Sequence, residues 1–264
     1  MSPDLVFWLV LATKMAITAL FVSVATIIAE RLGAAVGALV ATLPVSAGPA
    51  YVFLALDHDA GFISASALAS LALNVATAVF VTVYVLTAQR CSLWISASLA
   101  FAAWLATALA LSPLQWTAPS AFAANLIVFS LCLWIVRPFR LVPMPLVKRR
   151  WYDFVARAGM VALLVGAVVA LSFRVGPTAS GALAVFPVIY SSIVLILHRR
   201  VGGLATAAML ANSVPGLAGF GAALLMLHLL AVPLGSALAL TVALGVSVAW
   251  NAGLYATRHR ESPG

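Results

Sequence analysis

Apolar residues follow one another along this chain in long stretches, and most of the charged residues lie in the short segments between them. A helical run of about 20 apolar residues is as long as the hydrocarbon core of a bilayer is thick, about 30 Å. Strands of a membrane barrel alternate polar and apolar side chains, whereas these stretches are apolar on every side. Because lipid offers the backbone no hydrogen-bond partner, we expect each stretch to be a helix. The pattern predicts nine spans, at 5–28, 33–56, 62–87, 92–111, 120–136, 154–173, 176–197, 204–231 and 234–256.

The composition agrees with an all-α integral membrane protein and excludes a soluble domain. Of the 264 residues, 65% are hydrophobic and 8% are charged, against roughly 25% charged residues in a typical soluble domain. Cys91 and Cys132 share no spacing typical of metal ligands, and none of the usual hydrolase, metalloprotease or phosphate-binding motifs occurs. We therefore expect neither an enzyme nor a metal site nor a cofactor.

The basic residues are distributed unevenly between the two predicted membrane faces. Nine spans place eleven of the fourteen Lys and Arg residues on one face and only Arg174 on the other. Basic loops stay in the cytoplasm, so the sequence predicts an N-terminus outside and a cytoplasmic C-terminus in a bacterial inner membrane. The net charge of +8 lies in these loops, so we expect no nucleic-acid partner.

Two halves of the chain resemble each other at an offset of 143 residues, so that residues 14–54 match residues 157–197. The rarer residues coincide without a gap: Lys14 with Arg157, Arg31 with Arg174, Gly33 with Gly176 and Pro44 with Pro187. The repeat predicts a first unit at 1–111, a linker helix and basic loop at 112–150, and a second unit at 151–264. Four spans plus one linker span make an odd number, which would invert the second unit relative to the first. Inverted repeats are typical of secondary transporters, although a duplication kept only for stability is an alternative.

The segments Gly37–Pro44 and Gly181–Pro187 combine a Gly-x-Leu element with a proline and a following apolar run that contains hydroxyls. This pattern resembles small four-span inner-membrane proteins of the GlpM type, and two such units joined by an extra helix would give the present chain. The resemblance implies an association with envelope polysaccharide or lipid metabolism. The second segment has one residue fewer between its glycine and its proline.

Lys14 is the most informative candidate for a functional residue. It follows Asp4 by ten residues, or about 15 Å of helix, which predicts a position near the midplane. Basic residues at such depth usually face the interior of the bundle or a cavity. The acidic residues all fall in loops or at span ends, with Glu30 the one potential partner along the same helix. A basic group without an acidic neighbour favours an anionic substrate. Its repeat counterpart Arg157 has two alternatives, a buried role or a side chain that reaches the headgroups.

Prolines in the second, seventh and eighth spans predict broken helices, which often form substrate sites near the midplane. The predicted substrate-binding residues at these breaks are Pro44, Ser46, Pro187, Tyr190, Ser191 and Asn212, in addition to Lys14 and Arg157. Ordinary proline kinks are an alternative interpretation. Asn74, Asn125 and Asn251 are expected to form hydrogen bonds between helices.

The sequence as a whole favours a secondary transporter or flippase for an anionic small molecule or a lipid-linked substrate. Its partners would be the bilayer and that substrate, and a homodimer is compatible with this interpretation. The alternative is a membrane subunit that does not transport but supports a complex of envelope biosynthesis. In that case the prolines are kinks and Lys14 pairs with a partner chain.

Overall fold

The computed structural model describes residues 2–31, 47–141 and 151–260, and these residues form helices joined by short turns. The helices run in the order α1 (Pro3–Arg31), α3 (Ala47–Asp57), α4 (Ala60–Thr87), α5 (Leu93–Leu111), α6 (Ala118–Val136), the short 3-10 helix η1 (Arg137–Leu141), α7 (Trp151–Ala184), α8 (Val188–Leu234) and α9 (Ser236–Arg260).

Seven helices within the described ranges are long and apolar enough to cross a membrane, namely α1 and α4 to α9. Large apolar side chains such as Leu20, Ile127 and Leu163 are exposed on their outer faces. A soluble protein would lose stability by exposing so much apolar surface to water, whereas lipid tails cover it at no cost. The predicted all-helical, membrane-type fold is therefore supported.

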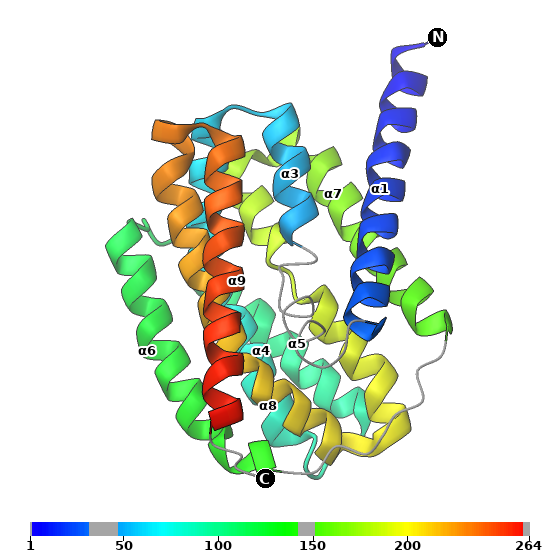
Figure 1. Ribbon diagram of the computed structural model, residues 1–264, viewed down its shortest axis with the longest axis vertical. Helices are drawn as coiled ribbons and strands as arrows, with labels where there is room; N and C mark the ends of the chain where they lie inside the picture. Colours follow the sequence, from blue (N-terminus) through cyan, green and yellow to red (C-terminus); the bar gives the residue numbers. More distant parts are fainter. Residues whose placement is uncertain (1, 32–46, 142–150, 261–264) are drawn as a thin grey trace.

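Helix α4 lies at the centre of the bundle and packs against α5, α6, α7 and α8 (Figure 1). Half of its buried residues have small side chains, among them Ala67, Ser70, Ala72 and Ala76. Small residues allow the backbones of neighbouring helices to approach closely, which is how helices associate where the hydrophobic effect does not drive them together. The sequence of α4 thus explains its central place.

Two of the longest helices are each interrupted at a glycine. The backbone is non-helical at Gly176 in α7, with φ 75°, and at Gly202 in α8, with φ 81°. Positive φ is readily adopted by glycine and costs other residues free energy. At 47 residues, α8 would be about 70 Å long as one straight helix, more than twice the thickness of the hydrocarbon core. The interruptions fall where the sequence predicts the boundaries between spans.

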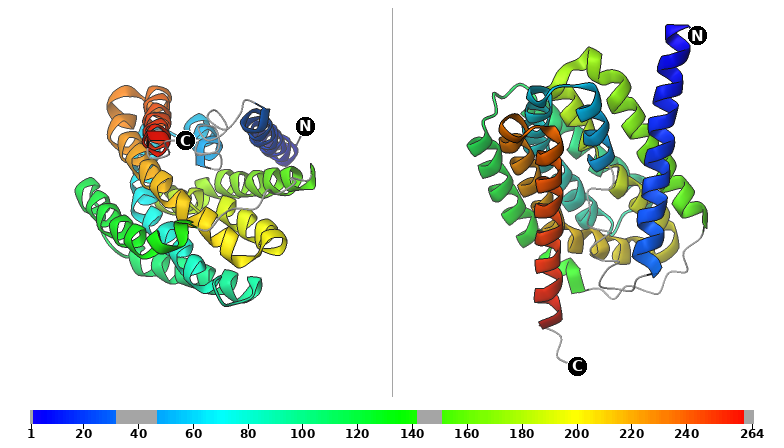
Figure 2. Two further views of the ribbon diagram at one scale, coloured as in Figure 1. Left: turned by 60° about the horizontal axis from the view of Figure 1, so that its bottom comes forward. Right: turned by 45° about the horizontal axis from the view of Figure 1, so that its top comes forward.

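The two ends of the chain lie at opposite ends of the bundle (Figures 1 and 2). Helix α1 starts at one end and runs towards the other, and it packs against α7, which runs in the opposite direction. The first helices of the two predicted units are therefore in contact.

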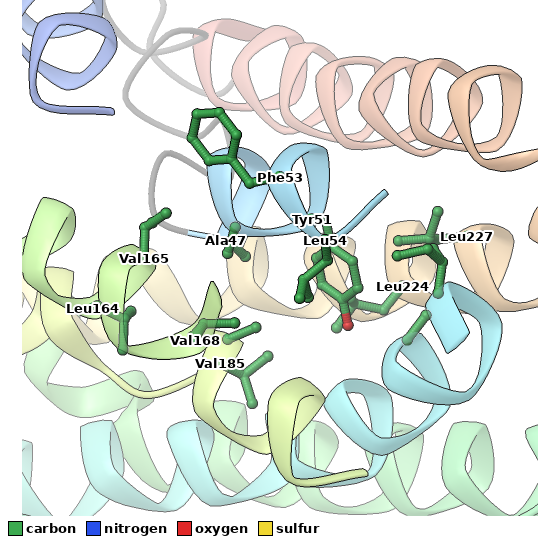
Figure 3. Packing of buried hydrophobic residues seen from close by; sticks show 14 of the residues in the cluster. Ala47, Tyr51, Phe53, Leu54, Leu164, Val165, Val168, Val185, Leu224 and Leu227 are labelled. Carbon is green, nitrogen blue, oxygen red and sulfur yellow. The ribbon is translucent and has the colours of Figure 1, made fainter. Parts of the chain in front are cut away.

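Helix α3 is held in the bundle by an apolar core (Figure 3). This core encloses a short series of hydrogen bonds. Tyr51 and Leu54 point from α3 towards Leu224 and Leu227 of α8. The hydroxyl oxygens of Tyr51 and Ser70 are 2.6 Å apart. Ser70 in turn donates a hydrogen bond of 2.7 Å to the carbonyl of Gly181, so three helices meet at this point.

The contact of α7 with α4 requires a glycine at position 181. A Cβ atom built there would lie 2.1 Å from the carbonyl oxygen of Ser66, which is backbone and cannot rotate away. Gly181 belongs to the Gly-x-Leu element that the sequence singles out. Gly219 has a similar role, since its Cβ would lie 2.1 Å from the Trp250 ring.

We predict that Gly181→Ala destabilises the protein by about 2 kcal/mol or more, because overpacking against rigid neighbours typically costs 1–3 kcal/mol. Thermal unfolding in detergent, followed by tryptophan fluorescence, measures the effect. Gly159→Ala in the same helix is the control, since no atom lies within 4 Å of the added Cβ. An equal decrease in Tm for both variants would contradict the assignment of a close helix contact at Gly181.

Candidate functional site

Lys14 of α1 forms an ion pair with Asp57, the last residue of α3. The ammonium nitrogen of Lys14 lies 2.6 Å from each carboxylate oxygen, and the two side chains are only 12% and 19% exposed. The same nitrogen lies 5.8 Å from the centre of the Phe53 ring, within the range of a cation–π contact. A charge removed from water is stabilised by such a close counter-charge.

This ion pair corrects the expectation that Lys14 has no acidic neighbour. Asp57 follows an apolar stretch and precedes a turn, so the sequence suggested a residue at a span end, away from Lys14. At 29 residues, however, α1 is longer than the roughly 20 residues that a span requires. Distance along it from Asp4 therefore does not fix the depth of Lys14. Its ammonium lies beside the C-terminal end of α3 rather than beside the middle of a helix.

A second ion pair joins α7 to the first part of α8. Arg200 donates two hydrogen bonds, of 2.5 and 2.6 Å, to the two oxygens of Asp153. Both side chains are mostly buried, at 19% and 14% exposed. Arg157, the sequence-predicted candidate, is half-buried one turn along α7 from Asp153.

Sequence reasoning missed the second pair because Asp153 and Arg200 fall at predicted span ends. The repeat contained a signal for it. Arg200 follows Asp57 by 143 residues. Asp57 ends α3 and pairs with α1, and Arg200 lies near the end of the first part of α8 and pairs with α7. If the predicted repeat is applied, the two contacts join equivalent elements, with the charges of the two partners exchanged.

The predicted break in the seventh span is present in the structure. Helix α7 ends at Ala184 and α8 begins at Val188, with the buried Pro187 just before it. Such a break leaves backbone carbonyls without their helical partners, and inside a membrane other groups must satisfy them. Thr77 of α4 donates a hydrogen bond of 3.1 Å to the carbonyl of Val185.

The hydroxyls after this break are partly used within the chain. Ser191 is buried and donates a hydrogen bond of 2.6 Å to the carbonyl of Pro187. Tyr190 is half-buried beside it. No side chain caps the first turn of α8. The N-terminus of α8, which is the positive end of the helix dipole, therefore lies at the break. Pro44 and Ser46, the predicted counterparts in the second span, lie outside the described residues.

Asn212 lies in a different place from the other predicted residues. Its amide nitrogen donates to the carbonyl of Arg140 at 3.0 Å, and its amide oxygen accepts from the Arg140 side chain at 3.2 Å. Asn212 thus fixes η1 against α8. The structure therefore divides the predicted residues between the α1–α3 ion pair, the α7–α8 break and this contact with η1.

Asparagines form a buried polar cluster in the centre of the bundle. Asn74 of α4 donates hydrogen bonds to Asn125 of α6, at 3.0 Å, and to the carbonyl of Leu217 in α8, at 3.3 Å. The predicted role of Asn74 and Asn125 in joining helices is confirmed. The side-chain oxygen of Asn74 is buried without a hydrogen-bond partner. Gly221 makes room for the cluster, since its Cβ would lie 3.1 Å from either amide.

Two histidines connect the halves of the chain, and sequence reasoning assigned them no role. His58 lies 2.8 Å from the hydroxyl of Ser172, and His198 lies 2.7 Å from the hydroxyl of Tyr84. Each histidine belongs to one predicted unit and its partner to the other. Such long-range pairs depend on tertiary contacts that a single sequence does not reveal.

Comparisons with protein-family models, with curated proteins and with solved structures give no match to this chain. The assignment of a function therefore rests on the residues themselves.

We predict that Asp57→Asn lowers stability by about 1–3 kcal/mol, because it leaves the ammonium of Lys14 largely buried without a counter-charge. The double variant Lys14→Glu with Asp57→Lys restores a pair and should recover most of the loss. Asp4→Asn is the control, since Asp4 is exposed at the start of α1. Thermal unfolding in detergent distinguishes these variants. A double variant no more stable than Asp57→Asn would show that the charges do not act as a pair.

Proposed function

We propose that the chain is a multi-pass secondary transporter or flippase of the bacterial inner membrane, for an anionic small molecule or a lipid-linked substrate. It would consist of two inverted four-span units joined by α6. The observation on which the proposal rests is that α5 and α9 begin, and the breaks at Gly176 and Gly202 fall, at the spacing that the sequence repeat predicts. An arrangement of this kind allows alternating access from the two sides of a membrane.

The boundaries of the helices repeat at the offset found in the sequence. The first residues of α5 and α9, Leu93 and Ser236, are 143 residues apart. The breaks at Gly176 and Gly202 stand at the positions equivalent to the end of the first span and the start of the third. With both breaks counted as span boundaries, α7 and α8 contribute three spans in place of two, as the nine-span topology requires.

Contacts between the halves also agree with a two-fold relation. Asn74 is hydrogen-bonded to the carbonyl of Leu217, 143 residues further along the chain. A contact between two positions so close to equivalent in the repeat is expected only near a two-fold axis. The opposite directions of α1 and α7 support an inverted second unit. Helix α1 begins and α9 ends at opposite ends of the bundle, as an odd number of spans requires.

The ion pair of Lys14 and Asp57 suggests how an anion would be recognised. A carboxylate or phosphate that enters beside α1 would compete with Asp57 for the ammonium. Exchange of one anionic partner for another avoids the cost of leaving a charge unpaired in a low-dielectric region. The break before α8, with Pro187, Tyr190 and Ser191, would supply the dipole and hydroxyls of a second contact with the substrate.

A subunit that does not transport is the alternative. This alternative would have Lys14 pair with a partner chain. Asp57 of the same chain already provides a counter-charge at 2.6 Å. The remaining interpretation of the proline breaks as simple kinks is tested by transport measurements.

We expect Lys14→Met to reduce transport by about 10- to 100-fold, since a hydrogen bond to a charged group is worth about 1.5–3 kcal/mol. The assay uses proteoliposomes of the full chain, with a panel of organic and phosphate anions and a fluorescent phosphatidylglycerol for flipping. Arg174→Gln is the control, because it also removes one positive charge, from an exposed residue that is distant from Lys14 in the sequence. A substrate transported equally by Lys14→Met and the unchanged chain would refute the role of Lys14. Failure of the unchanged chain to transport any of the anions would favour the alternative.

The inverted topology predicts which positions face the outside. In a chain with alanine in place of both native cysteines, cysteine at position 114 or 174 should react with an impermeant maleimide on intact cells. Cysteine at position 90 or 199 should react only after permeabilisation. All four positions are exposed. Labelling of position 174 from the cytoplasmic side only would rule out an inverted second unit.

A further inference from the structure

A cavity of about 450 Å³ lies where α6 ends, between η1, α8 and α9. Of the sequence-predicted substrate residues that the structure describes, none lines it. The residues around it are Leu133, Trp134, Arg137, Arg140, Pro215, Leu254 and Thr257. They combine two basic side chains with apolar ones.

The basic side of the cavity is built by η1. Arg137 and Arg140 are three residues apart in a 3-10 helix, which has three residues per turn, so they lie on the same face. Arg140 is half-buried and is fixed by the two hydrogen bonds with Asn212. Arg137 is exposed at the rim. Among the residues that the structure describes, no acidic side chain lines the cavity.

The other side of the cavity is apolar and lies beside exposed apolar side chains of α6. Trp134 is 73% exposed on α6, and Leu131 beside it is also exposed. Leu133 and Leu254 bring the same apolar character into the cavity. Exposed tryptophan at the end of a span is typical of the level where headgroups meet acyl chains.

We propose that this cavity binds the headgroup of an anionic phospholipid, such as phosphatidylglycerol, with its acyl chains along the apolar surface of α6. The guanidinium group suits a phosphate because it can donate two parallel hydrogen bonds. Basic pockets between membrane helices recognise acidic headgroups in this way. A free phosphate ion would use the arginines but would gain nothing from Trp134, and this difference favours the lipid. The proposal does not depend on transport, since it shares no residue with the Lys14 pair or the α7–α8 break.

The test is native mass spectrometry of the full chain in detergent, titrated with phosphatidylglycerol or with phosphatidylcholine of the same acyl chains. We expect saturable binding of phosphatidylglycerol, and binding about fivefold weaker in Arg137→Gln, the factor that corresponds to about 1 kcal/mol per basic side chain. Trp134→Ala should also weaken lipid binding. Arg90→Gln is the matched control, because Arg90 is exposed on the same predicted face but outside the cavity. Thermal unfolding of each variant verifies that it is folded.

Three outcomes would overturn the proposal. Equal losses in Arg137→Gln and Arg90→Gln would indicate general attraction to negative charge. Equal binding of phosphatidylcholine and phosphatidylglycerol would show that the arginines do not recognise an anionic headgroup. Stabilisation by inorganic phosphate that depends on Arg137, with no effect of Trp134→Ala on lipid binding, would identify a site for a free anion. Lys14→Met should retain the bound lipid, so this proposal and the proposed transport function can fail separately.

Discussion

A helix that breaks inside a bilayer leaves backbone carbonyls that water cannot reach, and the arrangement of this bundle depends on how they are satisfied. Where α7 ends, the hydroxyls of Ser70 and Thr77 on α4 donate to the carbonyls of Gly181 and Val185. This is feasible only because α4 and α7 approach closely, which Gly181 permits. Hydroxyls and small residues on one helix thus hold an interrupted neighbour in a region where a loop would otherwise be costly.

Charge imposes a second constraint on the same bundle. The Lys14 ammonium and the Asp153 carboxylate both lie on long, mostly apolar helices, and each is held by a partner at the end of a shorter segment. A helix end suits this purpose because it brings a polar side chain to the bundle without interrupting a span. The two ion pairs also fix the packing of α3 and of the first part of α8 against their neighbours.

Much of this architecture could be predicted from the sequence, because apolar length and loop composition are local properties. The breaks near Gly176, Pro187 and Gly202 follow from residues whose backbone preferences act locally. The nine spans and the inversion of the second unit stay predictions. The ion pair of Lys14 could not be predicted from the same information. It depends on the packing of α3 against α1, and the depth of a residue in a long helix is not set by its distance from the end of the chain.

The residues of the candidate site show the same limit of prediction from local sequence. Pro187, Tyr190 and Ser191 are close in the chain and lie together at the break between α7 and α8. Asn212 was grouped with them because of a predicted break at Pro215, but α8 continues as a helix through that proline. Its partner is a residue of η1, a segment that looks like part of a basic loop in the sequence. Hydrogen bonds between distant elements, such as those of His58 and His198, require the tertiary structure.

The negative charge at the end of α3 has a consequence for how the chain assembles. During insertion, α1 must pair with α3 and not with the first part of α8, which the predicted repeat makes equivalent to α3. The wrong pairing would place Lys14 against Arg200, and two like charges repel each other strongly in surroundings of low dielectric constant. In the observed contact Lys14 meets the carboxylate of Asp57 instead, so the opposite charges at the ends of α3 and of the first part of α8 let α1 distinguish its own partner from the equivalent segment of the other predicted unit.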